Sequence, residues 1–329
     1  MITCLPVEGI GEVARGDDLA KLLVAAIDLR DGDVLVVTSK VVSKAEGQVV
    51  TGAREEALVG ETDRVVARRG PTSIVRTHHG LVMAAAGIDA SNTVPGTLVL
   101  LPVDPDASAR GLRAGIAADG GPNVAVIVSD TSGRAWRTGQ TDIAVGAAGI
   151  EVLDDHAGRG DGYGNSLAVT APALADEITA AADLVTGKLS RSPAAVVRGL
   201  GRLVLARGED GPGASALVRP EAQDMFGLGA REAVVQAASR VDLRGFGQPA
   251  GSDHLREVLE QVLPGATVST GADMVHVALP AVAKVGERGL GALEERACAV
   301  AFGHGWTRLV QECDERSADA VLRFTPVTP

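Results

Sequence analysis

Short apolar runs that alternate with helical segments are the feature that most restricts the fold of this chain. Runs of Val, Ile, Leu and Ala bounded by glycine or polar residues are typical of buried strands, and they occur at residues 34–37, 80–92, 123–131 and 194–201. Apolar residues at helical spacing predict helices at residues 17–29 and 55–70. Residues 96–118 and 165–188 each predict a strand followed by a helix, with Asp106 as the N-cap of the first helix. This alternation predicts a mixed α/β (α+β) body that extends to about residue 240.

Three of the expected strands end in polar residues, namely TSK at 38–40, IDASN at 88–92 and SDT at 129–131. Ligands of α/β proteins gather at strand ends, so the three tips together carry more weight than any one of them. Asp89 and Asp130 are each compatible with a turn former or a helix cap. Together with a hydroxyl they also suit a hard divalent cation, because Mg²⁺ and Mn²⁺ prefer carboxylate, hydroxyl, water and phosphate oxygens.

Lysine and serine side chains follow the first of these tips. Lys40 and Lys44, together with Ser39 and Ser43, are typical either of a solvated strand end or of a phosphate clamp. The Walker A pattern G-x-x-x-x-G-K-S/T is absent from the chain, so any nucleotide would be held in another way. The stretch GIGEVA at residues 9–14 fits the loose dinucleotide-binding pattern, but it lacks a preceding strand and is more consistent with a plain turn.

Two arginines follow the third tip within the stretch SGRAWRTGQ. Arg134 and Arg137 are three residues apart and would share a face if the segment is helical. They are compatible with surface charges, with a salt bridge to Asp130, or with a paired fork for phosphate or carboxylate groups. Tyr163, in DGYGN, is the only tyrosine and either stacks on an aromatic ligand or packs a turn.

Composition argues against two classes of partner. A net charge of −11 and an aromatic content of 2% leave few cations for a nucleic-acid backbone and few rings for base stacking. No run approaches the roughly 18 apolar residues of a membrane span, and the N-terminus shows no signal-peptide pattern. The cysteines, Cys4, Cys298 and Cys313, are odd in number and widely spaced, which indicates reduced thiols and predicts a cytoplasmic location.

A Gly/Pro-rich break at residues 241–253 predicts a linker. We therefore expect one large domain over residues 1–242 and a small α+β module over residues 253–329.

Long motifs along the first part of the chain resemble one family. They are LPVEGIGEV, GDVLVVTSKVVSKAEG, AAAGIDASN, LLPVDPDASA, VSDTSGRAWRTGQTDIAVGAAG, DGYGNSLAVT and ADEITAAADLVTGKL. In this order they resemble coenzyme F420-0:L-glutamate ligases (gamma-glutamyl ligases) over roughly residues 3–230. The resemblance implies a family-specific, non-Walker fold and a homodimer. It also implies GTP-dependent addition of L-glutamate to coenzyme F420-0, extension by gamma-linked glutamates, and an acyl-phosphate intermediate.

The resemblance also implies a set of site residues. A pair of divalent ions is expected, with Asp89 and Asp130 binding one and Thr131 helping to hold the second, beside a monovalent cation such as K⁺. The residues expected to contact GTP are Ile10, Gly11, Glu12, Val13, Ser39, Lys40, Lys44, Asn92, Thr186 and Gly187. Lys44 would add positive charge near the phosphates during catalysis. Arg134 and Arg137 would clamp anionic substrates, because anions brought together in a low-dielectric site need cations between them.

Two departures from the family pattern limit these expectations. Lys188 stands where archaeal members tend to have an acidic residue near the second metal. The C-terminal part is too short for the flavin-binding domain of the fused actinobacterial form, so no FMN is expected. Two other functions stay open: an amide ligase of the same fold that acts on another acceptor acid, and a catalytically silent nucleotide-binding regulatory protein.

Overall fold

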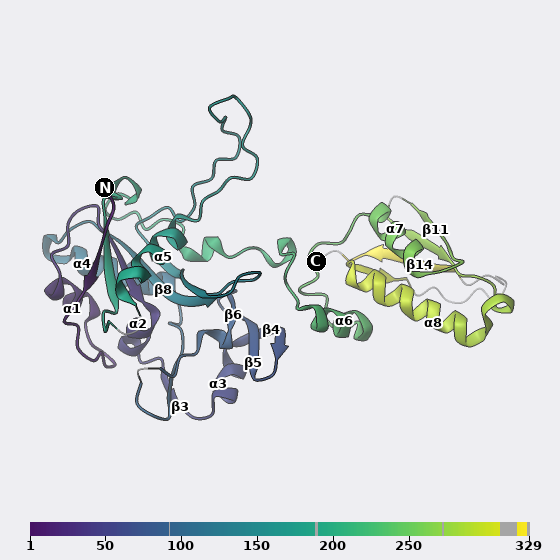
Figure 1. Ribbon diagram of the computed structural model, residues 1–329, viewed down its shortest axis with the longest axis horizontal. Coiled ribbons are helices and arrows are strands. Elements are labelled where there is room, and N and C mark those ends of the chain that lie inside the picture. The colour runs from purple at the N-terminus through teal and green to yellow at the C-terminus, as the bar shows by residue number, and fades with distance from the viewer. Residues whose placement is uncertain (92, 188–189, 272, 310–320, 328–329) are drawn as a thin grey trace. The chain divides into compact units, whose positions relative to one another are not determined.

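The computed structural model describes residues 1–91, 93–187, 190–271, 273–309 and 321–327, and its helices and sheets confirm the predicted mixed α+β class (Figure 1). The chain divides into two compact units. Unit 1 comprises residues 1–65 and 72–218, and unit 2 comprises residues 66–71 and 219–329. The predicted linker at 241–253 lies within unit 2, and the division into functional domains at 1–242 and 253–329 stays a prediction. No helix in the described ranges is long and apolar enough to cross a membrane.

A five-stranded sheet forms the centre of unit 1. Its strands, in spatial order, are β1 (Thr3–Val7), β10 (Ala194–Arg198), β2 (Val34–Thr38), β8 (Ala125–Gly133) and β9 (Gln140–Ala148). β2 and β8 run parallel, and Thr38 pairs with Ser129 at their carboxyl ends. The other neighbouring strands are antiparallel. The polar residues that follow β2 therefore lie at the same edge of the sheet as those at the end of β8.

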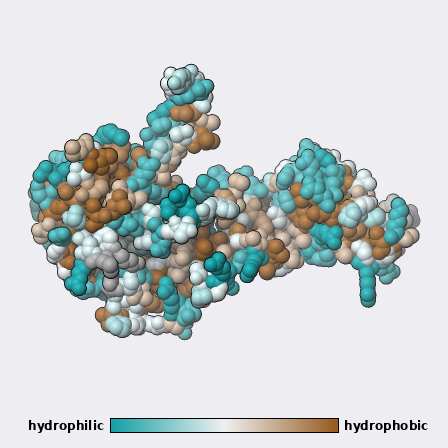
Figure 2. Space-filling model, viewed as in Figure 1, coloured by the Kyte–Doolittle hydropathy of each residue, from teal (hydrophilic) through white to brown (hydrophobic). Residues whose placement is uncertain are grey.

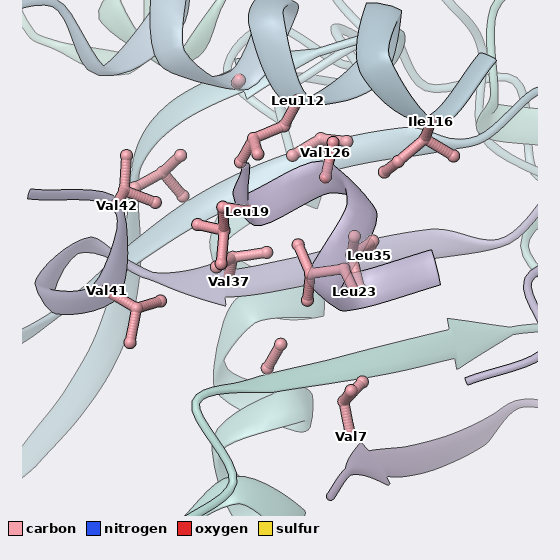
Figure 3. Packing of buried hydrophobic residues seen from close by; sticks show 14 of the residues in the cluster. Val7, Leu19, Leu23, Leu35, Val37, Val41, Val42, Leu112, Ile116 and Val126 are labelled. Carbon is pink, nitrogen blue, oxygen red and sulfur yellow. The ribbon is translucent and has the colours of Figure 1, made fainter. Parts of the chain in front are cut away.

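Helices cover both faces of this sheet because its strands are apolar on both sides. Leu35 and Val37 face a core that includes residues of α1 (Leu19–Ala26), α2 (Ser39–Glu46) and α4 (Pro105–Ala117) (Figure 3). Val34 and Val36 face the opposite core, which includes α5 (Leu174–Thr186). The sheet is thus a buried middle layer, and its polar strand ends are the part of it that remains open to ligands.

Smaller elements of unit 1 pack beside the central sheet, although residues 66–69 at the end of one of their strands belong to unit 2. They are β3 (Val49–Thr51), α3 (Arg54–Glu61), β4 (Thr62–Arg69), β5 (Thr72–Thr77), β6 (Val82–Ala84) and β7 (Thr97–Val99). β3 pairs with β7, and β4, β5 and β6 form a second small sheet. Their core contains Val75, Ala86, Ile88 and Leu98. An arm at residues 154–172 projects from unit 1 and carries apolar as well as hydrophilic side chains (Figures 1 and 2).

Unit 2 contains a four-stranded antiparallel sheet with helices. Its strands, in spatial order, are β11 (Thr267–Thr270), β12 (Val275–Ala278), β14 (Val321–Pro326) and β13 (Trp306–Arg308). Its helices are α6 (Ala230–Ser239), α7 (Ser252–Val262) and α8 (Val282–Gly303). Apolar residues of α7, α8 and the strands form one core, in which Phe324, Leu255 and Leu259 are fully buried.

Three predicted elements differ in the structure. The helix predicted at 55–70 ends at Glu61, and β4 follows, because Arg64 and Val66 are buried with the two-residue period of a strand. The strand predicted at 80–92 is only β6, since Ala85 and Ala86 adopt positive φ and turn the chain. The strand predicted at the start of 165–188 is reduced to an isolated bridge between Gly160 and Ser166.

Asp106 is not the N-cap of α4, and the prediction was wrong by two residues. Asp104 caps the helix by accepting a hydrogen bond from Ala107 N at 2.9 Å. Asp106 is buried and accepts hydrogen bonds from Ala147 N and Ala214 N at 2.8 and 2.7 Å. It therefore ties α4 to β9 and to a distant loop, a role that only the tertiary fold defines.

Candidate functional site

A cavity of about 930 Å³ lies in unit 1 at the carboxyl ends of β2 and β8. Most of the predicted site residues line it: Ile10, Gly11, Glu12, Val13, Ser39, Lys40, Lys44, Asp89, Asp130, Thr131, Thr186 and Gly187. They come from segments far apart in the sequence, so the fold brings together what the motifs had suggested separately. Asn92 and Lys188 lie outside the described residues.

The predicted arginines lie elsewhere. Arg134 and Arg137 are exposed in the turn that joins β8 to β9, and they are not among the residues that line the cavity. The segment is a hairpin and not a helix, so the shared helical face does not form. The side chain of Tyr163 is 97% exposed on the arm at 154–172.

The turn from β2 into α2 places a hydroxyl and two lysines in the cavity. Ser39 is the first residue of α2, and its Oγ donates a hydrogen bond to Asp130 Oδ1 at 3.0 Å. Lys40 and Lys44 are one helical turn apart and both line the cavity. Lys40 Nζ lies 2.6 Å from Asp89 Oδ2, and Lys44 Nζ lies 2.5 Å from a carboxylate oxygen of Glu12. Both ammonium groups therefore already face carboxylates.

Asp89 is fixed at the start of a loop. Its backbone pairs with Val99, and its Oδ1 accepts a hydrogen bond from Ser91 N at 2.6 Å. Burial alone would raise the pKa of the Asp89 carboxyl, but the hydrogen bonds from Lys40 and Ser91 outweigh burial and hold this pKa below its ordinary value. The Asp89 side chain is thus held as a carboxylate that faces a cation.

Asp130 has the opposite electrostatic balance. Burial raises the pKa of Asp130 to about 7, the hydrogen bond from Ser39 opposes this rise, and the negative charges of Asp142 and Asp89 add to it. Gly87 lies against this carboxylate: its φ is +72°, and a Cβ there would lie 3.2 Å from Asp130 Oδ2. Glycine at this position therefore leaves room for the Asp130 side chain.

Asp142 is a site residue that was not predicted from the sequence. It lies on β9 directly opposite Thr131, is 9% exposed and lines the cavity. Its two carboxylate oxygens accept hydrogen bonds from Thr131 Oγ1 at 2.8 Å and Ser129 Oγ at 3.1 Å. No local sequence pattern separates Asp142 from its neighbours, and only the hairpin pairing of β8 with β9 brings it to the site.

Asp183 and Arg191 also line the cavity without having been predicted. Asp183 is on α5, and Arg191 follows α5 in a left-handed conformation with φ of +60°. Neither position has a sequence pattern that separates it from ordinary surface charge. The cavity therefore carries lysine and arginine cations together with several carboxylates.

The donor set suits a hard cation. Asp89, Asp130 and Thr131 all contribute oxygen atoms to the same cavity, and oxygen ligands are what Mg²⁺ and Mn²⁺ prefer. The ammonium group of Lys40 neutralises Asp89, so this position beside the Asp89 carboxylate already accommodates a positive charge. Among the described residues, no three His, Cys, Asp or Glu side chains are arranged so that they could hold a metal ion by themselves, so a cation here would also need water or substrate oxygens.

Fold and site together define an α+β protein with a large cavity at strand ends, whose lining carries both carboxylates and cations. A comparison with known protein families matches residues 9–57 and 51–199 to the family described as F420-0:Gamma-glutamyl ligase. The chain belongs to this family, which confirms the resemblance. Every residue that lines the cavity lies within the matched range.

Several curated relatives support the same assignment. The Coenzyme F420:L-glutamate ligase of Methanothermobacter thermautotrophicus is 39% identical over 254 residues, which cover 68% of this chain and 98% of the relative. The enzyme of the same name from Methanopyrus kandleri is 39% identical, over 65% of this chain and 93% of its own length. That of Archaeoglobus fulgidus is 40% identical, over 60% of this chain and 88% of its own length.

Proposed function

We propose that this chain is an amide-forming ligase that adds L-glutamate to coenzyme F420-0 during coenzyme F420 biosynthesis and extends the product by gamma-linked glutamates. The observation that carries the proposal is the family match over residues 9–199, which contains the whole lining of the 930 Å³ cavity. Relatives named Coenzyme F420:L-glutamate ligase match this chain over nearly their full length. The cavity is large enough for several small anionic substrates to meet.

We propose GTP as the source of activation. An acceptor carboxylate is a poor electrophile, so a carboxylate oxygen would attack the γ-phosphorus of GTP, the bond to the β-phosphate would break, and GDP would leave. The acyl phosphate so formed would be attacked at its carbonyl carbon by the amine of L-glutamate. Phosphate leaves as the amide forms, and the amine gives up its proton. Phosphoryl transfer of this kind depends on positioning and charge neutralisation more than on covalent help from the protein.

The lysines of α2 support this chemistry through their positions. Lys40 and Lys44 lie one helical turn apart and point into the cavity, each against a carboxylate. On binding a triphosphate, their ammonium groups would exchange Asp89 and Glu12 for phosphate oxygens, so each lysine keeps an anionic partner. The lysines would therefore bind and orient the nucleotide without being left unpaired in its absence.

We propose that Asp89 and Asp130 hold one divalent ion, Mg²⁺ or Mn²⁺, and that Thr131 contributes to holding a second. When bound, such an ion supplies positive charge to the transferring phosphoryl group. The carboxylates of Asp89 and Asp130 orient their oxygens toward one cavity, and Ser39 and Ser91 fix them with hydrogen bonds. A monovalent cation and the homodimer expected from the resemblance stay predictions.

Arg134 and Arg137 have a further proposed task. They follow Thr131 closely along β8 and its turn, and they are exposed. The acceptor carries a phosphodiester and a carboxylate, and glutamate carries two carboxylates, so cations near the cavity would reduce the repulsion between these anions. We propose that at least one of the two arginines binds an anionic group of the acceptor or of glutamate.

The stoichiometry of nucleotide cleavage tests the proposed function. Purified full-length protein is incubated with GTP, Mn²⁺, coenzyme F420-0 and L-glutamate, and GDP and phosphate are measured by chromatography. We expect one GDP and one phosphate per glutamate consumed, only when acceptor and glutamate are both present. If another acceptor acid but not F420-0 supports GTP cleavage, the chain would instead be an amide ligase of the same fold that acts on that other acid. GTP binding without cleavage under any of these conditions would favour a silent regulatory protein.

A further inference from the structure

The pairing of β8 with β9 places a buried carboxylate behind one of the proposed metal ligands. Asp142 on β9 is in register with Thr131 on β8, and Thr131 Oγ1 donates a hydrogen bond to Asp142 Oδ1 at 2.8 Å. Ser129 Oγ donates to the second oxygen, Oδ2, at 3.1 Å. Ser129 and Thr131 are two residues apart on one strand, so their side chains share a face and both reach Asp142. The carboxylate is therefore held at two points.

We infer that Asp142 is a positioning residue that turns the hydroxyl proton of Thr131 toward β9 and leaves the oxygen lone pairs of Thr131 directed at the cavity. The inference rests on the proposed function, in which Thr131 contributes to a divalent-cation site. Asp142 would act through Thr131 and would not itself need to touch the ion.

The physical reason lies in the hydroxyl group. A threonine hydroxyl has one proton and two lone pairs, and its proton goes to the strongest acceptor within reach. An ionised carboxylate only accepts hydrogen bonds, so both partners of Asp142 must direct their protons at it. With its proton committed to Asp142, Thr131 can offer only oxygen lone pairs to a ligand, which is the polarity that a cation requires. The negative charge of Asp142 also makes the lone pairs of the Thr131 oxygen stronger electron-pair donors to a metal ion.

An amide at position 142 would remove this control. Asparagine has nearly the same shape as aspartate, but one of its two polar ends donates hydrogen bonds. Either Ser129 or Thr131 would then face a donor, and the neighbouring negative charge would be lost. Changes behind a metal ligand usually weaken metal affinity by about 10- to 100-fold. We expect a loss in this range for Asp142→Asn.

A direct Mn²⁺ titration tests the inference on the full-length protein, with and without a non-hydrolysable GTP analogue, because Lys40 pairs with Asp89 in the absence of phosphate oxygens. Binding is followed by the electron paramagnetic resonance signal of free Mn²⁺ and by isothermal titration calorimetry. The variants are Asp142→Asn, Asp130→Asn, Thr131→Val and the double variant Thr131→Val/Asp142→Asn. Asp176→Asn is the matched control, because Asp176 is also partly buried and accepts a hydrogen bond from β9, at Ala144 N, but does not line the cavity.

If Asp142 acts through Thr131, the Mn²⁺ affinities of the variants should differ in a way that destabilisation of the fold alone would not produce. Asp142→Asn should weaken Mn²⁺ binding about 10- to 100-fold, and Asp176→Asn should bind as the wild type does. In the Thr131→Val background, Asp142→Asn should have little additional effect, because the hydroxyl on which Asp142 acts is gone. If Asp142→Asn does not fold, Thr131→Val alone should show the same loss of affinity.

The outcomes separate this inference from the proposed function. Wild-type affinity in Asp142→Asn together with lost affinity in Asp130→Asn would overturn the positioning role and leave the metal site standing. Fully additive losses in the double variant would also overturn it, since Asp142 would then act independently of Thr131. Absence of Mn²⁺ binding by the wild-type protein both with and without the GTP analogue would refute the proposed metal site itself, and the positioning role with it.

Discussion

Replacing Gly87 with alanine should damage the cavity without removing any charged group. Gly87 lies between the Asp130 carboxylate and Leu101, and its φ is +72°. A Cβ at this position would lie 3.1 Å from Leu101 Cγ and 3.2 Å from Asp130 Oδ2, both closer than ordinary van der Waals contact. The new methyl group would therefore push against the carboxylate that is proposed to bind the divalent ion.

The expected cost has two parts. The left-handed backbone conformation costs about 1–2 kcal/mol for a residue with a Cβ, partly offset by about 0.4–1 kcal/mol from the lower entropy of the unfolded chain. Crowding against Leu101 and Asp130 adds about 1–3 kcal/mol, as inserted methyl groups in packed regions do. The free energy of unfolding should therefore fall by about 2–4 kcal/mol in Gly87→Ala.

A matched glycine isolates the part due to crowding. Gly120 has a φ of +81°, and a Cβ at this position would have no neighbouring atom within 4 Å, so Gly120→Ala carries only the backbone cost. Urea denaturation should show that Gly87→Ala is less stable than Gly120→Ala by about 1–3 kcal/mol. Calorimetry should show weakened Mn²⁺ binding only in Gly87→Ala. Equal stability and equal Mn²⁺ affinity in the two variants would refute the reasoning.

Three further predictions concern charged groups. Asp130 holds a proton in the folded chain between about pH 4 and 7 that the unfolded chain has released, so its burial destabilises the metal-free fold as pH rises through this window. The stability of Asp130→Asn relative to wild type should therefore be greater at about pH 8 than at about pH 5, and pH-independent urea midpoint differences would contradict this. Lys44→Met should raise the KM for GTP about tenfold or more, whereas Lys21→Met, an exposed control paired with Asp18, should not; equal KM values would count against the phosphate role. Arg134→Ala should lower ligase turnover or raise a substrate KM while the circular dichroism spectrum is unchanged, and wild-type kinetics would exclude the anion clamp.

The strand ends of the central sheet could be predicted from the sequence. Buried strands leave strong local signals, and Asp89 and Asp130 stand out because polar residues follow apolar runs. The family motifs supplied further lining residues, including Glu12 and Thr186, whose own patterns are weak. Local patterns predicted the polar residues at the strand ends. The parallel pairing of β2 with β8 explains why the polar residues after β2 and those at the end of β8 lie at the same edge of the sheet.

Other features depended on tertiary structure and could not be predicted locally. Residues 62–69 read as a continuation of a helix, but packing gave them a strand period. The sequence predicted Asp106 as a helix cap, but its carboxylate accepts hydrogen bonds from the backbone N–H groups of Ala147 on β9 and of Ala214. Asp142 had no separate signal because its importance comes from the hydroxyls opposite it.

The mass of the product tests the central claim most directly. Coenzyme F420-0 is incubated with the purified chain, GTP, Mn²⁺ and L-glutamate, and the acceptor is analysed by mass spectrometry, with Asp89→Ala as the inactive control. The proposed function predicts that the acceptor gains the mass of one or more glutamyl residues with the wild-type chain and gains none with the control. An unchanged acceptor mass with folded, GTP-supplied wild-type protein would contradict it.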